Sequence, residues 1–214
     1  MLLHVDAVQA GAELVLPNYA TLDEGLDFVF SKRRWLKERL GETLPPVPFA
    51  DGTRVPLMGT PLLIRRVDML FPDIWREGGE LIVACPATEL AARVRNWFMT
   101  AASGEIRRRA RHKAAQLGRG IRRITIRDPR TMWGSCSPKS NLSFSWRLVM
   151  APEKVLDYVV SHEVAHLIEL NHTRRFWNIV DTLCDDVDGP REWLRQNGAA
   201  LHRYGAEVPS RKAL

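Results

Sequence analysis

Cysteine is scarce in this sequence of 214 residues, and the three cysteines are odd in number and far apart. They form no Cys-x-x-Cys pair and no disulfide framework, which argues against a small disulfide-held secreted domain and favours a reducing compartment. No stretch approaches the roughly 18 apolar residues of a membrane helix, and the first residues lack the basic and apolar regions of a signal peptide. We therefore expect a globular, cytoplasmic protein that has no membrane partner.

The length allows one full hydrophobic core, and the order of the elements favours an α+β fold in one compact domain, residues 1–214. Residues 1–130 would form an N-terminal β/α portion, and residues 131–214 a metal-binding catalytic portion. Sequence patterns predict strands over residues 13–16, 54–57, 62–67, 80–85 and 121–127, and a hairpin over 133–148. Helices are predicted over residues 22–40 and 88–118, directly after Pro152, and over residues 173–184 and 190–204.

The most informative segment is residues 161–177, which contains the pattern His-Glu-x-x-His at His162, Glu163 and His166. On an α-helix, residues four apart lie on the same face, so both imidazoles can reach one ion. Glu163 can approach a water molecule bound to that ion and take its proton. Pro152 and the apolar positions after it favour a helix here. The pattern predicts a metal site in preference to an ordinary helix with two surface histidines.

A third metal ligand is needed, and His172 is a candidate for it. On an unbroken helix, the six residues after His166 would carry His172 to a different face, so the helix has to end between them. Asn171 is a candidate for a left-handed residue at that end. Spacing alone leaves Glu192 open as an alternative third ligand. Three protein ligands leave one position for water or substrate, which is typical of catalytic zinc sites.

The net charge of +6 is concentrated in one segment of the chain. Ten arginine and lysine residues lie between Glu105 and Arg130, and only two carboxylates lie in the same segment. Its central part, Arg107–Arg123, could hold the phosphates of a nucleic acid or a nucleotide. The simpler interpretation is a solvated helix face, and no aromatic side chain is interleaved to stack on bases.

Several residues near the predicted hairpin and the metal helix have two interpretations. Leu142–Arg147 could be an edge strand that pairs with an extended peptide, or an internal strand paired on both sides. Gly134 would permit a close approach or an unusual backbone angle, and Cys136 is expected to be a buried small residue and not a nucleophile. Packing is the expected role of Tyr158, and Glu169 could orient a ligand histidine or be solvated.

Three blocks of sequence, in this order, resemble the YgjP-like metallopeptidases, a zincin family related to the SprT-like proteases. They are Trp-Gly-Ser-Cys-Ser at residues 133–137, Trp-Arg-Leu at 146–148, and the run over 158–177 with its three histidines and Phe176-Trp177. The resemblance implies a minimal zincin-like metallopeptidase fold, in which a small mixed or antiparallel sheet packs against the active-site helix and C-terminal helices. It also implies that His162, His166 and His172 hold Zn²⁺ and that Glu163 is the general base.

The leading hypothesis is a zinc-dependent hydrolase, a metallopeptidase that attacks a peptide or protein substrate with activated water. Two alternatives stay open. The same chemistry could hydrolyse a nucleotide or another phosphoester held by the arginines. The chain could also be a nucleic-acid-associated protease of the SprT-like kind, whose binding would depend on salt.

Overall fold

A computed structural model describes residues 1–6, 11–17, 19–36, 45–71 and 73–206 of the chain. The chain divides into two compact units, one of Met1–Pro48 with His202–Leu214 and the other of Phe49–Leu201. One domain over residues 1–214 stays a prediction.

The first unit is built from a hairpin and a short helix. Strand β1 (Leu2–Asp6) pairs antiparallel with β2 (Gly11–Val15), which contains most of the strand predicted over residues 13–16. Helix α1 (Leu22–Ser31) begins after a capping box, because the Thr21 side chain accepts a hydrogen bond from the main-chain N–H of Glu24 while the Glu24 carboxylate accepts one from Thr21. Residues 33–36 are again helical, and the predicted helix end at residue 40 lies outside the described residues.

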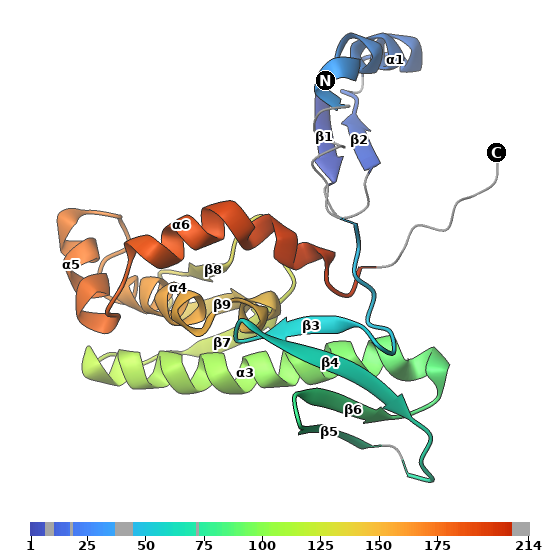
Figure 1. Ribbon diagram of the computed structural model, residues 1–214. Helices are drawn as coiled ribbons and strands as arrows, with labels where there is room; N and C mark the ends of the chain where they lie inside the picture. The colour runs from blue at the N-terminus through green and yellow to red at the C-terminus, as the bar shows by residue number, and fades with distance from the viewer. Residues whose placement is uncertain (7–10, 18, 37–44, 72, 207–214) are drawn as a thin grey trace. The chain divides into compact units, whose positions relative to one another are not determined.

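Two small mixed sheets form the β part of the second unit (Figure 1). The first contains β3 (Arg54–Leu57), β4 (Thr60–Val67), β5 (Asp73–Glu77) and β6 (Glu80–Ala84), in the spatial order β3-β4-β6-β5. Only β4 and β6 run parallel in this sheet. Three of these strands were predicted, whereas β5, a short segment with acidic residues at both ends, was not.

The second sheet contains β7 (Arg123–Arg127), β8 (Gly134–Cys136) and β9 (Asn141–Ser145), in the order β7-β9-β8. The hairpin of β8 and β9 is confirmed, and β7 joins β9 in parallel. Because β9 is paired on both sides, the interpretation of Leu142–Arg147 as an edge strand is wrong and the internal-strand alternative is right. The segment also stops being a strand at Trp146, where a 3₁₀-helix, η2 (Trp146–Met150), begins.

The long predicted helix is present as α3 (Leu90–Gln116), after a 3₁₀ turn, η1 (Ala87–Glu89). Its buried positions recur mostly every four residues and form one apolar stripe, namely Leu90, Val94, Phe98, Ala102, Ile106, Ala110 and Ala114. The ring of Phe98 stacks on Phe49 at 5.7 Å and lies 6.4 Å from the buried Trp146. Helix α3 packs against η2 and against the helix that follows it in the chain, so its apolar stripe forms a large part of the core of this unit.

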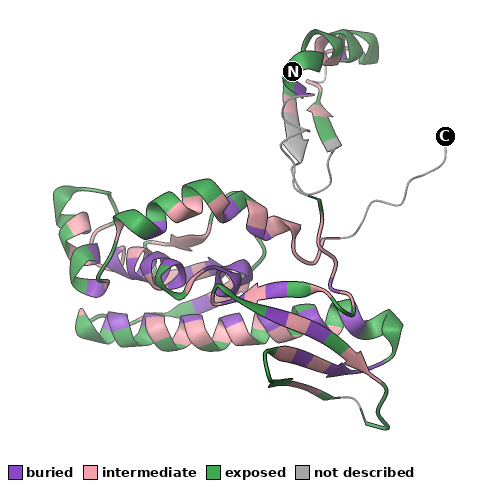
Figure 2. Cartoon of the chain, in the orientation of Figure 1, coloured by how far each residue is buried: buried purple, intermediate pink, exposed green. Residues whose placement is uncertain are grey.

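The last part of the unit is helical, as predicted, with α4 (Glu153–Ala165), α5 (Arg174–Leu183) and α6 (Asp188–Asn197). A 3₁₀-helix, η3 (Gly198–Arg203), follows α6. Buried residues predominate along α4 and exposed residues along α6 (Figure 2). The fold is α+β, in agreement with the prediction. Among the helices that the structure describes, none combines the length and the apolar content needed to cross a membrane.

Candidate metal centre

Helix α4 carries the first part of the candidate site. Its apolar side chains are buried and anchor the helix in the core, namely Val155, Leu156, Val159, Val160 and Val164. The helix ends at Ala165, where the N–H groups of Leu167 and Ile168 bond back to the carbonyls of Val164 and Ala165. It therefore ends before His172, as the spacing requires. The left-handed residue expected at Asn171 is not found, because among the described non-glycine residues only Met58 and Ser140 have positive φ.

The ring nitrogens of His162, His166 and His172 come together, with one atom of each within 4.8 Å of the others. Nε2 of His162 lies 3.0 Å from Nε2 of His172, close to the about 3.3 Å that separates two nitrogen ligands of a tetrahedral zinc ion. His172 directly precedes Thr173, the N-cap of α5, so the start of α5 places it. Glu192, the alternative third ligand, is not part of this cluster, and its carboxylate bonds to Arg195 at 2.6 Å.

An aromatic side chain of α5 supports all three imidazoles. The fully buried Phe176 stacks on His166 with ring centroids 4.5 Å apart, and its ring lies 4.9 Å from His162 and 4.7 Å from His172. Trp177 lies 5.8 Å from His172 on the neighbouring side. The Phe176-Trp177 pair in the sequence was a signal for this support, but the contact with every histidine follows only from how α5 packs on α4.

Hydrogen bonding and burial keep two of the rings in the form that binds a metal. Nδ1 of His166 donates to the main-chain carbonyl of Glu169 at 2.9 Å, which leaves the Nε2 lone pair free. Glu169 thus orients a histidine through its backbone and not through its carboxylate. Burial, with smaller contributions from the nearby His166 and His172, lowers the pKa of His162 to about 4. Burial also lowers the pKa of His166, although its bond to Glu169 acts in the opposite direction.

Glu163 lies on the inner side of α4, where it is buried with 6% of its surface exposed. Burial raises the pKa of its carboxyl to about 7. The residue packs against Gly134 of β8, because a Cβ atom on that glycine would stand 2.7 Å from Oε1 of Glu163. The close approach predicted for Gly134 is therefore confirmed, and its partner is the glutamate of the motif.

Two further residues near the site have packing roles. Cys136 of β8 is half-buried, and burial, with the nearby Glu163 adding to it, raises the pKa of its thiol to about 11. The thiolate that a nucleophile needs is thus disfavoured, in agreement with that part of the prediction, although the residue is half-buried and not fully buried as expected. Tyr158 is buried one turn before His162, with the two ring centroids 6.0 Å apart.

The donor set suits a zinc ion. Three imidazoles converge, two of them held neutral by their surroundings, and zinc takes such nitrogen ligands in a tetrahedral arrangement. His172 is exposed while the other two are half-buried, so the cluster can be reached from solvent on one side.

The sequence profile of the YgjP-like metallopeptidase domain matches residues 2–197 of the chain. The chain belongs to the YgjP-like metallopeptidase family. The resemblance carried by the three sequence blocks is thereby confirmed, and the match extends well beyond them. A search of curated protein sequences finds no match. Among solved structures, the crystal structure of the metallopeptidase zymogen of Pyrococcus abyssi abylysin is similar, with a TM-score of 0.39 and 19% identity, over 46% of this chain and 97% of that one.

In this YgjP-like chain, the cations of the basic segment lie in two different environments. Arg109 and the buried Lys113 of α3 both bond to Asp157 of α4, at 3.0 and 2.9 Å, so these cations join two helices. Arg107 and Arg111, by contrast, line a hollow beside β7. The interpretation of the whole segment as one solvated helix face is therefore incomplete.

Proposed function

We propose that the chain is a zinc-dependent peptidase in which His162, His166 and His172 hold the ion and Glu163 is the general base. The observation that supports this most directly is the convergence of three imidazoles on α4 and α5, beside a buried carboxyl group. Membership of a metallopeptidase family supports a peptide or protein substrate.

Zinc, when bound, lowers the pKa of a coordinated water molecule and polarises a carbonyl group. Glu163 follows directly after one ligand, so its carboxylate can accept a proton from the attacking water and pass it to the leaving amine. Burial raises the pKa of the carboxyl to about 7, which favours both accepting and releasing a proton near neutral pH. Phe176 holds the three rings at fixed orientations while this happens.

The open edge of β8 offers a place for an extended peptide. In the β8–β9 ladder, the N–H of Ser137 donates to the carbonyl of Asn141, and the N–H of Ser145 donates to the carbonyl of Trp133. Along a strand of an antiparallel ladder, the main-chain N–H and C=O groups of alternate residues point towards the partner strand and away from it. The main-chain groups of Gly134 and Cys136 therefore face away from β9, and none of the described strands pairs with that edge. A peptide added there would lie beside Glu163, so we propose β8, and not β9, as the substrate strand.

The test is to measure zinc content and peptide cleavage for the wild type and three variants. Glu163→Gln should retain zinc and lose turnover, whereas His166→Ala should lose both. Glu169→Gln is the matched control, because it keeps the main-chain carbonyl that bonds to His166, and among the described residues its carboxylate accepts a hydrogen bond only from the main-chain N–H of Asn171. The charge that it removes raises the pKa of His166, so its loss favours the neutral ring and should not cost zinc. Full cleavage by Glu163→Gln would exclude the proposed base.

The phosphoester alternative is separated in the same experiment by offering nucleoside triphosphates beside peptides. Hydrolysis of nucleotides that is lost in Glu163→Gln, with no peptide cleavage, would favour that alternative.

A cytoplasmic location also stays a proposal, and it is supported by the free state of Cys85, Cys136 and Cys184.

A further inference from the structure

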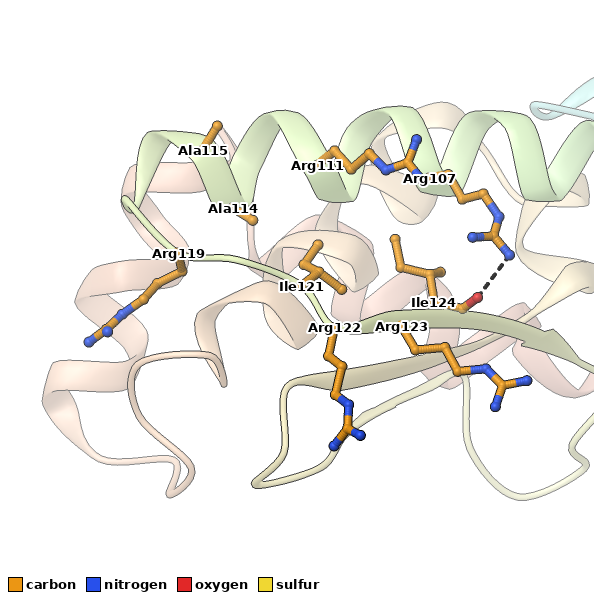
Figure 3. Close-up of a pocket in the computed structure, with 9 residues that line it drawn as sticks. All are labelled: Arg107, Arg111, Ala114, Ala115, Arg119, Ile121, Arg122, Arg123 and Ile124. Carbon is orange, nitrogen blue, oxygen red and sulfur yellow. Dashed lines mark hydrogen bonds between the residues drawn. The ribbon is translucent and has the colours of Figure 1, made fainter.

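A hollow of about 430 Å³ lies between the end of α3 and β7, and it is lined by five arginines (Figure 3). They come from three parts of the chain: Arg107 and Arg111 from α3, Arg119 and Arg122 from the connection, and Arg123 from β7. Ile121 and Ile124 lie between the helix and the strand. Gly118, with φ of +63°, ends the helix and lets the chain turn back beneath it. Folding therefore brings together positive charges from three parts of the chain, and they do not all lie on one face of a helix.

These arginines are free of carboxylate partners. Arg107 donates to Ser103 and to the Ile124 carbonyl, and no described carboxylate forms an ion pair with any of the five. Other arginines of the same helix behave differently, since Arg108 and Arg109 both pair with Glu105. Four guanidinium groups of the hollow are thus exposed and form no ion pair within the described part of the chain, those of Arg111, Arg119, Arg122 and Arg123.

The basic surface continues past this hollow in two directions. A neighbouring hollow shares Arg107 and Arg123 and runs along α3 as far as Met99, and another shares Arg122 and Arg123 and reaches Arg127. No aspartate or glutamate lines any of the three. We call this continuous surface the arginine band. Its guanidinium groups are spread out and do not converge on one point, which suits a chain of charges better than a single anion (Figure 3).

We propose that the arginine band binds the phosphate backbone of a nucleic acid without reading its sequence. A duplex presents one negative charge about every 1.7 Å, and arginine forks pair with phosphate oxygens through two parallel hydrogen bonds. The band has no aromatic lining residue on which a base could stack and no carboxylate to hold a magnesium ion, so a single nucleotide fits it poorly. The same absence favours a duplex over a single strand.

The band shares no residue with the histidine cluster or with β8. Nucleic-acid binding and peptide cleavage can therefore be measured separately, and neither result depends on the other.

The test measures binding of the full chain to a short DNA duplex and to an RNA duplex of mixed sequence, across a range of salt concentrations. The Arg122→Ala/Arg123→Ala variant removes two exposed arginines that two of the hollows share. It should weaken binding roughly tenfold to hundredfold at about 0.1 M salt and reduce the slope of log affinity against log salt by about 1.8 for a DNA duplex. The control variant Arg54→Ala/Arg76→Ala removes the same charge from exposed positions on β3 and β5, and should bind as the wild type does.

Three results would overturn the proposal. One is the absence of salt-dependent binding to both duplexes, and another is an equal loss in the two variants, which would mean that net charge alone is responsible. The third is clearly tighter binding of inorganic polyphosphate or polyglutamate than of either duplex at equal total charge, which would assign the band to a free polyphosphate or an acidic protein. Thermal unfolding and zinc content of both variants should match the wild type, since the substituted side chains are exposed and unpaired.

Discussion

Gly134 and Glu163 lie so close together that a methyl group on the glycine would stand 2.5 Å from Cγ and 2.7 Å from Oε1 of the glutamate. The contact joins an edge strand to the helix of the histidine motif. It holds the carboxyl group where only a residue without a side chain leaves room, next to the strand edge proposed for the substrate.

Gly134→Ala should therefore displace the Glu163 carboxyl and impair catalysis while the histidines still bind zinc. A displacement of about 1 Å can cost on the order of a hundredfold in rate, so we expect a fall in kcat of about that size with unchanged zinc content. Gly104→Ala is the control, because its added methyl group would meet nothing within 4 Å. It should stabilise α3 by about 0.5–1 kcal/mol and leave kcat unchanged. A Gly134→Ala enzyme with normal kcat would show that the carboxyl adjusts without consequence.

Glu163→Gln should stabilise the zinc-free protein, and the gain should grow with pH. The pKa of Glu163 is raised from 4.5 to about 7 in the fold, so the wild type loses stability as pH rises from about 4.5 through about 7, and glutamine does not titrate. Over that window the advantage of the variant should increase by at most about 3 kcal/mol. His162 also titrates, with stability lost as pH falls below about 6.5, but it does so in both proteins.

The measurement is urea unfolding of both proteins with a chelator present, at about pH 5 and about pH 8. An advantage of the same size at both pH values would mean that the carboxyl ionises in the fold as easily as in water.

Phe176→Ala should destabilise the protein by about 3–5 kcal/mol, because it empties a fully buried site. It should also weaken zinc binding, since the rings of all three histidines lose the surface that orients them. Phe71→Ala removes the same side chain from a position that is 75% exposed, and should change stability by less than about 0.5 kcal/mol. Denaturant unfolding and zinc titration of the two variants measure both effects, and normal zinc affinity in Phe176→Ala would exclude an orienting role.

Asp157→Ala should cost about 3 kcal/mol of stability, because it leaves the buried ammonium of Lys113 without a carboxylate. Lys113→Met should cost clearly less, since Asp157 keeps its bond to Arg109. The exposed pair of Arg93 and Glu89 is the control, and its removal should cost at most about 0.5 kcal/mol. Unfolding free energies of the single variants measure this order, and equal costs for Asp157→Ala and Lys113→Met would contradict it.

Local patterns predicted most of the elements and the residues of the candidate site. Helix start and stop signals predicted α3, and a turn signal between residues 133–137 and 142–148 predicted the hairpin, because both kinds of signal depend on neighbours in the chain. Local geometry also required the helix to end if His172 is to join His166, although spacing alone left Glu192 open as the third ligand and only the resemblance implied His172. Strand β5 escaped prediction because five residues with charged ends carry little periodicity.

The amino-acid sequence by itself determined the motif on a helix, the end of that helix before His172, the family resemblance and the concentration of positive charge. The tertiary structure alone decided which strand of the hairpin has an open edge, since β7 comes from before the hairpin and covers β9. It also decided which cations are structural, because Asp157 of α4 reaches Lys113 and Arg109 and leaves the arginines beside β7 unpaired. Strand order and ion pairing join residues far apart in the chain, so no local spacing encodes them.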